Sequence, residues 1–212
     1  MCLLYHDKKQ YETAALFMTY AISEGFTLSW WNFADPFLYL DKYASTEQVK
    51  KYLKIIENSD QNSLEYHLIK KYKYDKNRYL DLLGTIELRN GNLDEALDFD
   101  LQVDFDFWQS SYHYSNYLSR NPFKEYFQNV QIERTKIPYT DRMFENKAFF
   151  VTSLKGVSNL YNNAKGEEKG RYALMLANAY YNTTYFGKHW HYLAYGKSIY
   201  GGDLYFTIST FM

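Results

Sequence analysis

The chain has 212 residues, which is enough for one domain or for two small ones. Its 24 basic and 25 acidic side chains give a formal net charge of −1, which disfavours a dedicated nucleic-acid-binding protein. A hydrophobic content of 46%, with only 10 glycines and 3 prolines, excludes a disordered or collagen-like chain. The unusual feature is the aromatic content, because 24 tyrosines, 15 phenylalanines and 4 tryptophans make up 20% of the residues.

The sequence contains no targeting signal. Cys2 is the only cysteine, which excludes an intrachain disulfide and a cysteine-based zinc cluster. No apolar run reaches the roughly 18 residues of a membrane-spanning helix, and the residues after Met1 lack the charged and apolar regions of a signal peptide. The compartment is left open between the cytoplasm and the cell envelope. Because the chain ends in an apolar run over 204–212, we expect it to be a fragment of a longer protein.

Helical periodicity dominates the first half of the chain. Apolar residues at i, i+3, i+4 and i+7 predict a helix over 9–24, with a stripe that runs from Tyr11 to Ile22. Ser45 and Gln48 have the spacing of a capping box at the start of the next helix. Two more helices are expected, over 64–72 and over 76–89. Asn90-Gly91 is expected to end the second of these in a left-handed conformation, and Asn92 is expected to cap the helix that follows.

The second half predicts fewer helices. The Tyr/Ser-rich stretch 110–120 is expected to be a loop or a poor helix, and Asn121-Pro122 is expected to start a new helix. Thr140 or Asp141 is expected to cap a long helix that ends near Gly166. One more strong helix is expected over 171–185, and strand signals are weak except in the tail, so the predicted fold class is all-α.

Small residues at fixed intervals suggest helix hairpins. Gly84 and Ala96 lie twelve positions apart and Gly91 lies between them, so two helices joined by a glycine turn would bring the two small residues together. The stretch 83–97 resembles a tetratricopeptide repeat in these features. The resemblance implies an α-solenoid-like array of antiparallel helix hairpins, in which small residues allow close helix contact.

Two weaker matches make the period irregular. Tyr11, Ala14 and Ala21 have the spacing of a second half-repeat, and the segment from Leu176 to Tyr180 resembles a first half. The stretch 178–187 together with these helices also resembles large uncharacterised helical-repeat proteins of bacteria, which carry a fold but no established activity.

The expected organisation is one tetratricopeptide-like helical domain over 1–195, with a sub-boundary near 110–121 as an open alternative. The residues 196–212 are expected to form a truncated tail.

The sequence predicts no catalytic residue, no metal site and no cofactor. His189-Trp190-His191 comes nearest to a metal motif, but residues two apart on a helix point in different directions, and no cysteine or carboxylate completes the set. We expect two partly exposed histidines beside a packed tryptophan. The acidic run 94–106 is expected to be a solvated helix face, and the Lys/Tyr-rich stretch 67–79 a helix surface that does not bind nucleic acid.

The aromatic surplus has two interpretations that can hold together. Tyrosine and tryptophan fill gaps between the layers of thin helical arrays, and they are also favoured at recognition surfaces. The best candidates for contact with a partner lie near or beyond predicted helix ends: Trp30, Trp31, Trp108, Tyr112, Tyr114, Tyr117, Trp190 and Tyr192.

These observations predict a non-catalytic interaction or scaffold module of a larger bacterial protein. It is expected to bind a protein, peptide or glycan partner through an aromatic-rich helical surface, in an oligomeric state that the sequence leaves open. The alternative is a hydrolytic enzyme domain with a site near His189 and His191.

Overall fold

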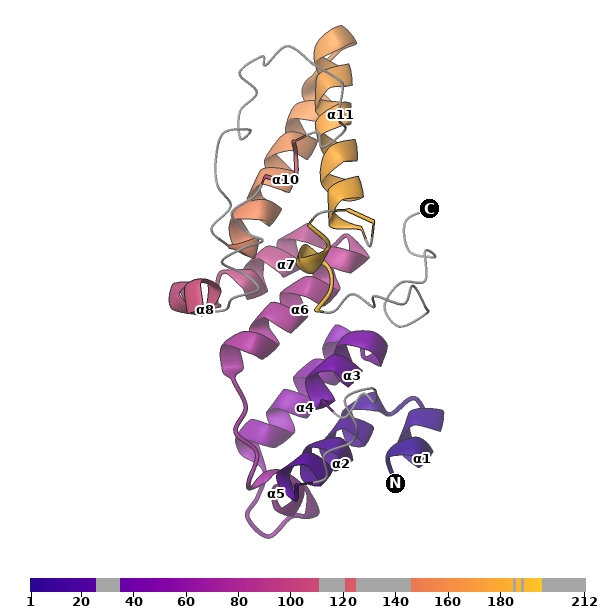
Figure 1. Ribbon diagram of the computed structural model, residues 1–212, viewed down its shortest axis with the longest axis vertical. Helices are drawn as coiled ribbons and strands as arrows, with labels where there is room; N and C mark the ends of the chain where they lie inside the picture. Colours follow the sequence, from indigo (N-terminus) through magenta and orange to yellow (C-terminus); the bar gives the residue numbers. More distant parts are fainter. Residues whose placement is uncertain (26–34, 111–120, 125–145, 185, 188, 196–212) are drawn as a thin grey trace. The chain divides into compact units, whose positions relative to one another are not determined.

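The computed structural model of the chain describes residues 1–25, 35–110, 121–124, 146–184, 186–187 and 189–195. These residues form ten α-helices and one short 3-10 helix, and no β-strand occurs among them (Figure 1). The predicted all-α class is therefore confirmed. Among the described helices, none combines the length and the hydrophobicity that crossing a bilayer requires.

The chain divides into two compact units, which are described separately here as unit 1 (residues 1–86) and unit 2 (residues 87–212). The division falls inside helix α6, which runs from Lys76 to Asn90. The expected sub-boundary near 110–121 and the expected tail over 196–212 lie largely outside the described residues.

Unit 1 is built around helix α2, which packs against α1, α3, α4 and α5. Ala14 and Ala15 on α2 are fully buried, and their small side chains let the neighbouring helices approach closely. The first part of α6 completes the unit. The bounds of the other helices are α1 Cys2–Asp7, α2 Tyr11–Ser23, α3 Pro36–Tyr43, α4 Thr46–Asn58 and α5 Leu64–Ile69.

The buried face of α2 differs from the predicted stripe. Leu16 and Thr19 are buried together with the two alanines, whereas Ile22, at the end of the predicted stripe, is 36% exposed. The reason lies in a hydrogen bond, because the Thr19 hydroxyl lies 2.7 Å from the hydroxyl of Tyr52 inside the unit. A threonine that is satisfied in this way takes an inward position that hydrophobicity alone would not assign to it.

The capping box predicted for unit 1 forms, and α3 begins with a cap of its own. The Ser45 hydroxyl accepts a hydrogen bond from the Gln48 backbone N–H, and the Gln48 side chain accepts one from the Ser45 N–H, which completes the capping box of α4. Helix α3 begins at Pro36, and the carboxylate of Asp35 accepts a hydrogen bond from the Phe37 N–H at 2.9 Å. Proline suits the first helical position because it has no N–H to leave unpaired.

The described residues of unit 2 form the end of α6, four further α-helices and the 3-10 helix η1. The α10 and α11 helices form a hairpin, α10 also packs against α7, and η1 packs against α11 (Figure 1). The bounds are α7 Leu93–Asp100, α8 Phe105–Ser110, α10 Lys147–Asn163, α11 Gly166–Thr183 and η1 Trp190–Tyr192.

The turn between α6 and α7 has the predicted glycine stop. Gly91 has a φ of +80°, a left-handed conformation that a residue without a Cβ adopts at little cost. Asn92 stands at the N-cap position of α7, but its side chain does not cap the helix. Instead the Asn92 amide donates a hydrogen bond to the carboxylate of Glu87 at 2.6 Å. A helix–turn–helix with a central glycine is what the tetratricopeptide resemblance implies, and a repeat array stays a prediction.

One predicted helix start in unit 2 is corrected, and a second falls largely outside the described residues. Helix α10 begins at Lys147, where the Asn146 side chain accepts a hydrogen bond from the Phe149 N–H at 2.8 Å. The caps expected at Thr140 or Asp141 lie outside the described residues. The Asn121 side chain accepts a hydrogen bond from the Phe123 N–H at 2.9 Å, which is a bond that an N-cap residue makes. Residues 125–145 lie outside the described part of the chain, so the helix expected after Pro122 stays a prediction.

Candidate functional site

The structure buries two of the aromatic residues expected on a binding surface. Trp108 is 1% exposed and Tyr192 is fully buried, whereas Trp190 is half-buried. Their burial excludes Trp108 and Tyr192 from an exposed contact surface. The remaining candidates lie outside the described residues: Trp30, Trp31, Tyr112, Tyr114 and Tyr117.

The two buried aromatic residues serve as core of unit 2. The Tyr192 ring packs on the Phe150 ring at a centroid distance of 4.4 Å, and the Trp108 ring stands edge-on to Phe107 at 5.5 Å. Each such ring removes a large apolar area from water, which makes aromatic residues a main source of core stability. At these two positions the packing interpretation of the aromatic surplus holds.

The exposure expected for His189 and His191, at the start of η1 and within it, is also wrong. His189 is fully buried and His191 is 4% exposed, whereas partly exposed side chains were expected. Both rings pack near the ring of Tyr192, at centroid distances of 6.3 Å and 5.1 Å. Within the described part of the chain, no group of three or more His, Cys, Asp or Glu side chains is arranged to hold a metal ion.

The acidic run is exposed except at one position. Asp94 and its neighbours are solvated as expected, and Asp94 forms an ion pair with Lys155 of α10. Asp100, at the end of α7, is only 2% exposed. The helical turn that exposes Asp94 and Asp98 places Asp100 on the inner side of α7, so the sequence run does not correspond to a single face.

Unit 2 carries a cleft of about 230 Å³, called here the aromatic cleft. Its walls come from the end of α6, the start of α7, the middle of α10, the end of α11 and the segment after η1. The lining residues are Leu88, Arg89, Asn90, Gly91, Leu93, Phe150, Leu154, Tyr180, Thr183 and Leu193.

The floor of the aromatic cleft is apolar and its edge is a tyrosine. Phe150 and Leu154 lie one helical turn apart on α10 and are each 2% exposed, so they form a floor that is already packed. Tyr180 of α11 is 45% exposed at the rim. Tyr192 lies behind the floor against Phe150, so the buried aromatic core supports the cleft.

The electrostatics of the aromatic cleft do not favour acid–base chemistry. Its described lining residues include no carboxylate and no histidine, and Arg89 carries the only formal charge among them. One Arg89 nitrogen donates a hydrogen bond to the Leu193 carbonyl oxygen at 3.4 Å, which ties the segment after η1 to the end of α6. Burial raises the pKa of Tyr180 above its ordinary value, so its hydroxyl stays protonated at physiological pH. The cleft therefore offers apolar contact and hydroxyl hydrogen bonding.

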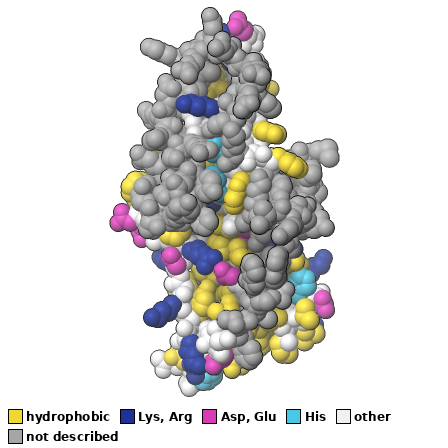
Figure 2. Space-filling view, viewed as in Figure 1, with side chains coloured by type: hydrophobic (Ala, Val, Ile, Leu, Met, Phe, Trp, Pro, Cys, Tyr) yellow, Lys and Arg dark blue, Asp and Glu magenta, His cyan; other side chains and the backbone are white. Residues whose placement is uncertain are grey.

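Sequence reasoning missed Tyr180 at the rim and two further exposed aromatic residues near the end of α11. Tyr181 is 49% exposed and Phe186 is 71% exposed. Tyr180 and Tyr181 lie between the buried positions Ala179 and Asn182 of α11, so their side chains point away from the inward face of the helix. The sequence of α11 did contain a signal for these exposed tyrosines, because the helix has more tyrosines than one buried apolar stripe can hold. Figure 2 shows hydrophobic side chains exposed among charges of both signs on the viewed face of the described residues.

No protein-family model matches this chain, and no curated protein and no solved structure matches it. The functional argument therefore depends on the geometry of the described residues.

Proposed function

We propose that the chain is a non-catalytic interaction module that binds a protein or peptide partner through the aromatic cleft of unit 2. The observation that carries the proposal is the combination of a packed apolar floor, Phe150 and Leu154, with a half-exposed Tyr180 at its rim. Tyrosine is among the residues that supply most of the binding energy in protein interfaces, because it buries a large area at a small cost in side-chain entropy.

The size of the cleft favours a side chain over a cofactor. A volume of about 230 Å³ lies below the range of roughly 300–1,000 Å³ that is typical of small-molecule and cofactor sites. It suits one large aliphatic or aromatic side chain of a partner, which would contact the Phe150 ring. The Tyr180 hydroxyl would donate a hydrogen bond to a backbone carbonyl oxygen of the partner.

The hydrolytic alternative has no support among the described residues. His189 and His191 are buried and do not line the aromatic cleft. A general base has to reach the substrate within hydrogen-bond distance, directly or through one water, and these side chains have no exposed surface from which to do so.

The proposal is tested by screening the chain against a phage-displayed peptide library and a glycan array. We expect enriched peptides that share a large apolar or aromatic residue, and we expect Tyr180→Ser to weaken their binding by about tenfold or more, as for a hot-spot tyrosine. Tyr172→Ser is the matched control, because Tyr172 lies on the same helix and does not line the cleft.

Equal binding by the Tyr180→Ser variant and the parent protein would contradict the proposal. Binding of glycans instead of peptides, with the same dependence on Tyr180, would keep the cleft and replace the class of partner.

A further inference from the structure

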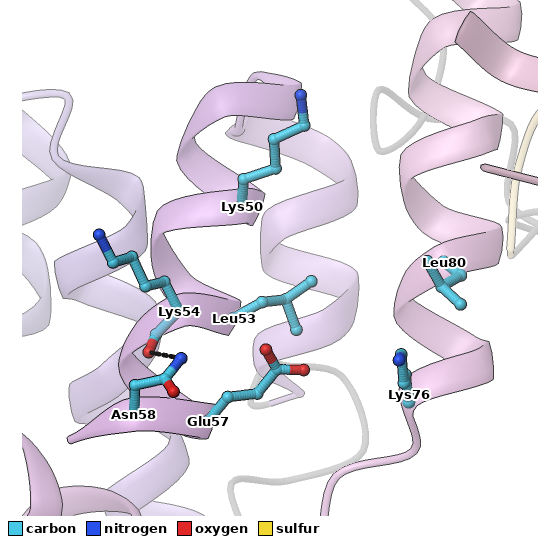
Figure 3. A pocket seen from close by; sticks show the side chains of 7 residues that line it. All are labelled: Lys50, Leu53, Lys54, Glu57, Asn58, Lys76 and Leu80. Carbon is cyan, nitrogen blue, oxygen red and sulfur yellow. Dashed lines mark hydrogen bonds between the residues drawn. The ribbon is translucent and has the colours of Figure 1, made fainter. Parts of the chain in front are cut away.

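Unit 1 has a second cleft, between α4 and the first turns of α6, whose lining is basic. It has a volume of about 280 Å³ and is called here the lysine cleft. Figure 3 shows its side chains, with Leu53 of α4 and Leu80 of α6 on the two sides of the gap. The lining residues are Lys50, Leu53, Lys54, Glu57, Asn58, Lys76 and Leu80.

The charge of the lysine cleft departs from that of the chain. Three ammonium groups and one carboxylate line it, a local net charge of +2, whereas the whole chain carries −1. The excess of positive charge is concentrated around an apolar floor, because Leu80 is only 8% exposed and Leu53 is half-buried. Such a surface is complementary to a ligand that has an apolar centre and anionic flanks.

The carboxylate of the cleft is held at one end. Glu57 accepts a hydrogen bond from the Tyr74 hydroxyl at 2.7 Å. Burial, together with this hydrogen bond to the Glu57 carboxylate, raises the pKa of Tyr74 to about 12, so the hydroxyl keeps its proton and continues to donate. In Figure 3, Glu57 and Asn58 lie near the same end of α4, while Lys50 lies toward the other end of the helix.

The lysines are able to turn toward a ligand. Lys50 pairs with Glu47 at 3.0 Å on the outer side of α4, but both side chains are exposed, so water competes strongly for this contact. The Lys54 amine points away from α6 in Figure 3, and its flexible four-carbon stem allows it to turn inward. Lys76 stands at the start of α6, across the cleft from α4.

We propose that the lysine cleft binds an acidic peptide segment, with an apolar side chain between Leu53 and Leu80 and flanking carboxylates on Lys50, Lys54 and Lys76. A peptide is favoured over a nucleic acid because the floor is aliphatic. The lining residues that the structure describes include no aromatic ring that could stack on a base. This site lies in unit 1 and does not depend on the aromatic cleft of unit 2.

The proposal is tested by fluorescence anisotropy with the full chain and a labelled Glu-Asp-Leu-Asp-Glu peptide with blocked ends. We expect saturable binding that weakens as the salt concentration rises. Each single change Lys50→Gln, Lys54→Gln or Lys76→Gln should weaken the affinity by about 2- to 5-fold, and the triple variant by about tenfold or more. Replacement of leucine by serine in the peptide should also weaken binding, because the floor loses its apolar partner.

The matched control is the double variant Lys70→Gln/Lys73→Gln, which removes exposed lysines of unit 1 that do not line the cleft. It should bind the peptide as the parent does, as should Tyr180→Ser, which separates this result from the test of the aromatic cleft. Equal affinity of the triple variant and the parent would overturn the proposal. Tighter binding of a short oligothymidylate with the same lysine dependence, or indifference to leucine in the peptide, would overturn it too and indicate a general polyanion site.

Discussion

The hydroxyl oxygens of Thr19 and Tyr52 lie 2.7 Å apart in the core of unit 1. Because Thr19 donates its single proton to the Ala15 carbonyl oxygen at 2.9 Å, Tyr52 has to be the donor toward Thr19. Tyr79 donates in turn to Tyr52 at 3.5 Å, and the hydroxyls of Tyr72 and Tyr79 lie 3.1 Å apart. Four hydroxyl groups therefore form one chain of hydrogen bonds that ends on a backbone carbonyl of α2.

Removing the acceptor at the end of this chain should destabilise the protein. Thr19→Val keeps the shape of the side chain and leaves the buried Tyr52 hydroxyl without its acceptor, so the free energy of unfolding should fall by about 1–3 kcal/mol. Urea unfolding followed by circular dichroism measures the change. Thr13→Val is the control on the same helix, where the side chain is half-buried, and it should change the free energy of unfolding by less than about 0.5 kcal/mol. Equal stability of Thr19→Val and the parent would show that the hydroxyl chain contributes nothing.

The same tyrosines predict how stability depends on alkaline pH. Burial holds the pKa of Tyr52 and of Tyr79 well above the ordinary value of a tyrosine. Above about pH 10 the unfolded chain loses these phenolic protons and the folded chain retains them, so the unfolded state is favoured as the pH rises.

The free energy of unfolding should stay constant with respect to these two groups below about pH 10. Above that pH it should fall by about 1.4 kcal/mol per pH unit for each of the two tyrosines. Urea unfolding at a series of alkaline pH values measures the slope. Tyr79→Phe should give a shallower slope than the parent, and identical slopes would contradict the assignment.

Much of the helical architecture could be predicted from local signals. The capping box of Ser45, the stop at Gly91 and the periodicity over 76–89 depend on neighbours within one helical turn, so the sequence is sufficient to place them. Asn92 shows where local signals fail. It stands at the right position to cap α7, and its amide bonds to Glu87 because the turn brings that carboxylate within 2.6 Å.

The candidate site could not be predicted, because it depends on packing between distant segments. Trp108 and Tyr180 look alike to sequence reasoning, as large aromatic residues near helix ends, yet one is 1% exposed and the other 45%. The difference arises from which side of each helix the rest of the unit covers, and that depends on residues far away in the sequence. The lysine cleft likewise needs α4 and α6 to lie beside each other, although Lys54 and Lys76 are 22 positions apart in the chain.

Asn182 should be a strong determinant of the stability of unit 2. Its side-chain amide is 3% exposed and donates hydrogen bonds to the Pro122 carbonyl oxygen at 2.7 Å and to the Lys124 carbonyl oxygen at 3.0 Å. Asn182→Ala leaves two carbonyl oxygens without this donor, so the free energy of unfolding should fall by about 2–3 kcal/mol.

Asn163→Ala is the comparison for this prediction. Its exposed amide bonds only to the Asn159 carbonyl oxygen of its own helix, so its replacement should change the free energy of unfolding by less than about 0.5 kcal/mol. Urea unfolding measures both variants. A loss in Asn182→Ala no greater than that in Asn163→Ala would show that the turn at 121–124 is not held by this residue.

Two glycines of unit 2 should respond to alanine in opposite directions. A Cβ added to Gly187 would lie 2.1 Å from the Asn182 carbonyl oxygen, and that oxygen is fixed because it accepts a hydrogen bond from the His189 N–H at 2.8 Å. Gly187→Ala should therefore force the chain away from the end of α11 and lower the free energy of unfolding by about 1–3 kcal/mol. Gly170 lies inside α11 with no atom within 4 Å of an added Cβ, so Gly170→Ala should raise stability by about 0.5–1 kcal/mol through its better helix propensity. Thermal unfolding of the two variants side by side tests the close approach at Gly187, and a Gly187→Ala protein that melts at or above the temperature of the parent would refute it.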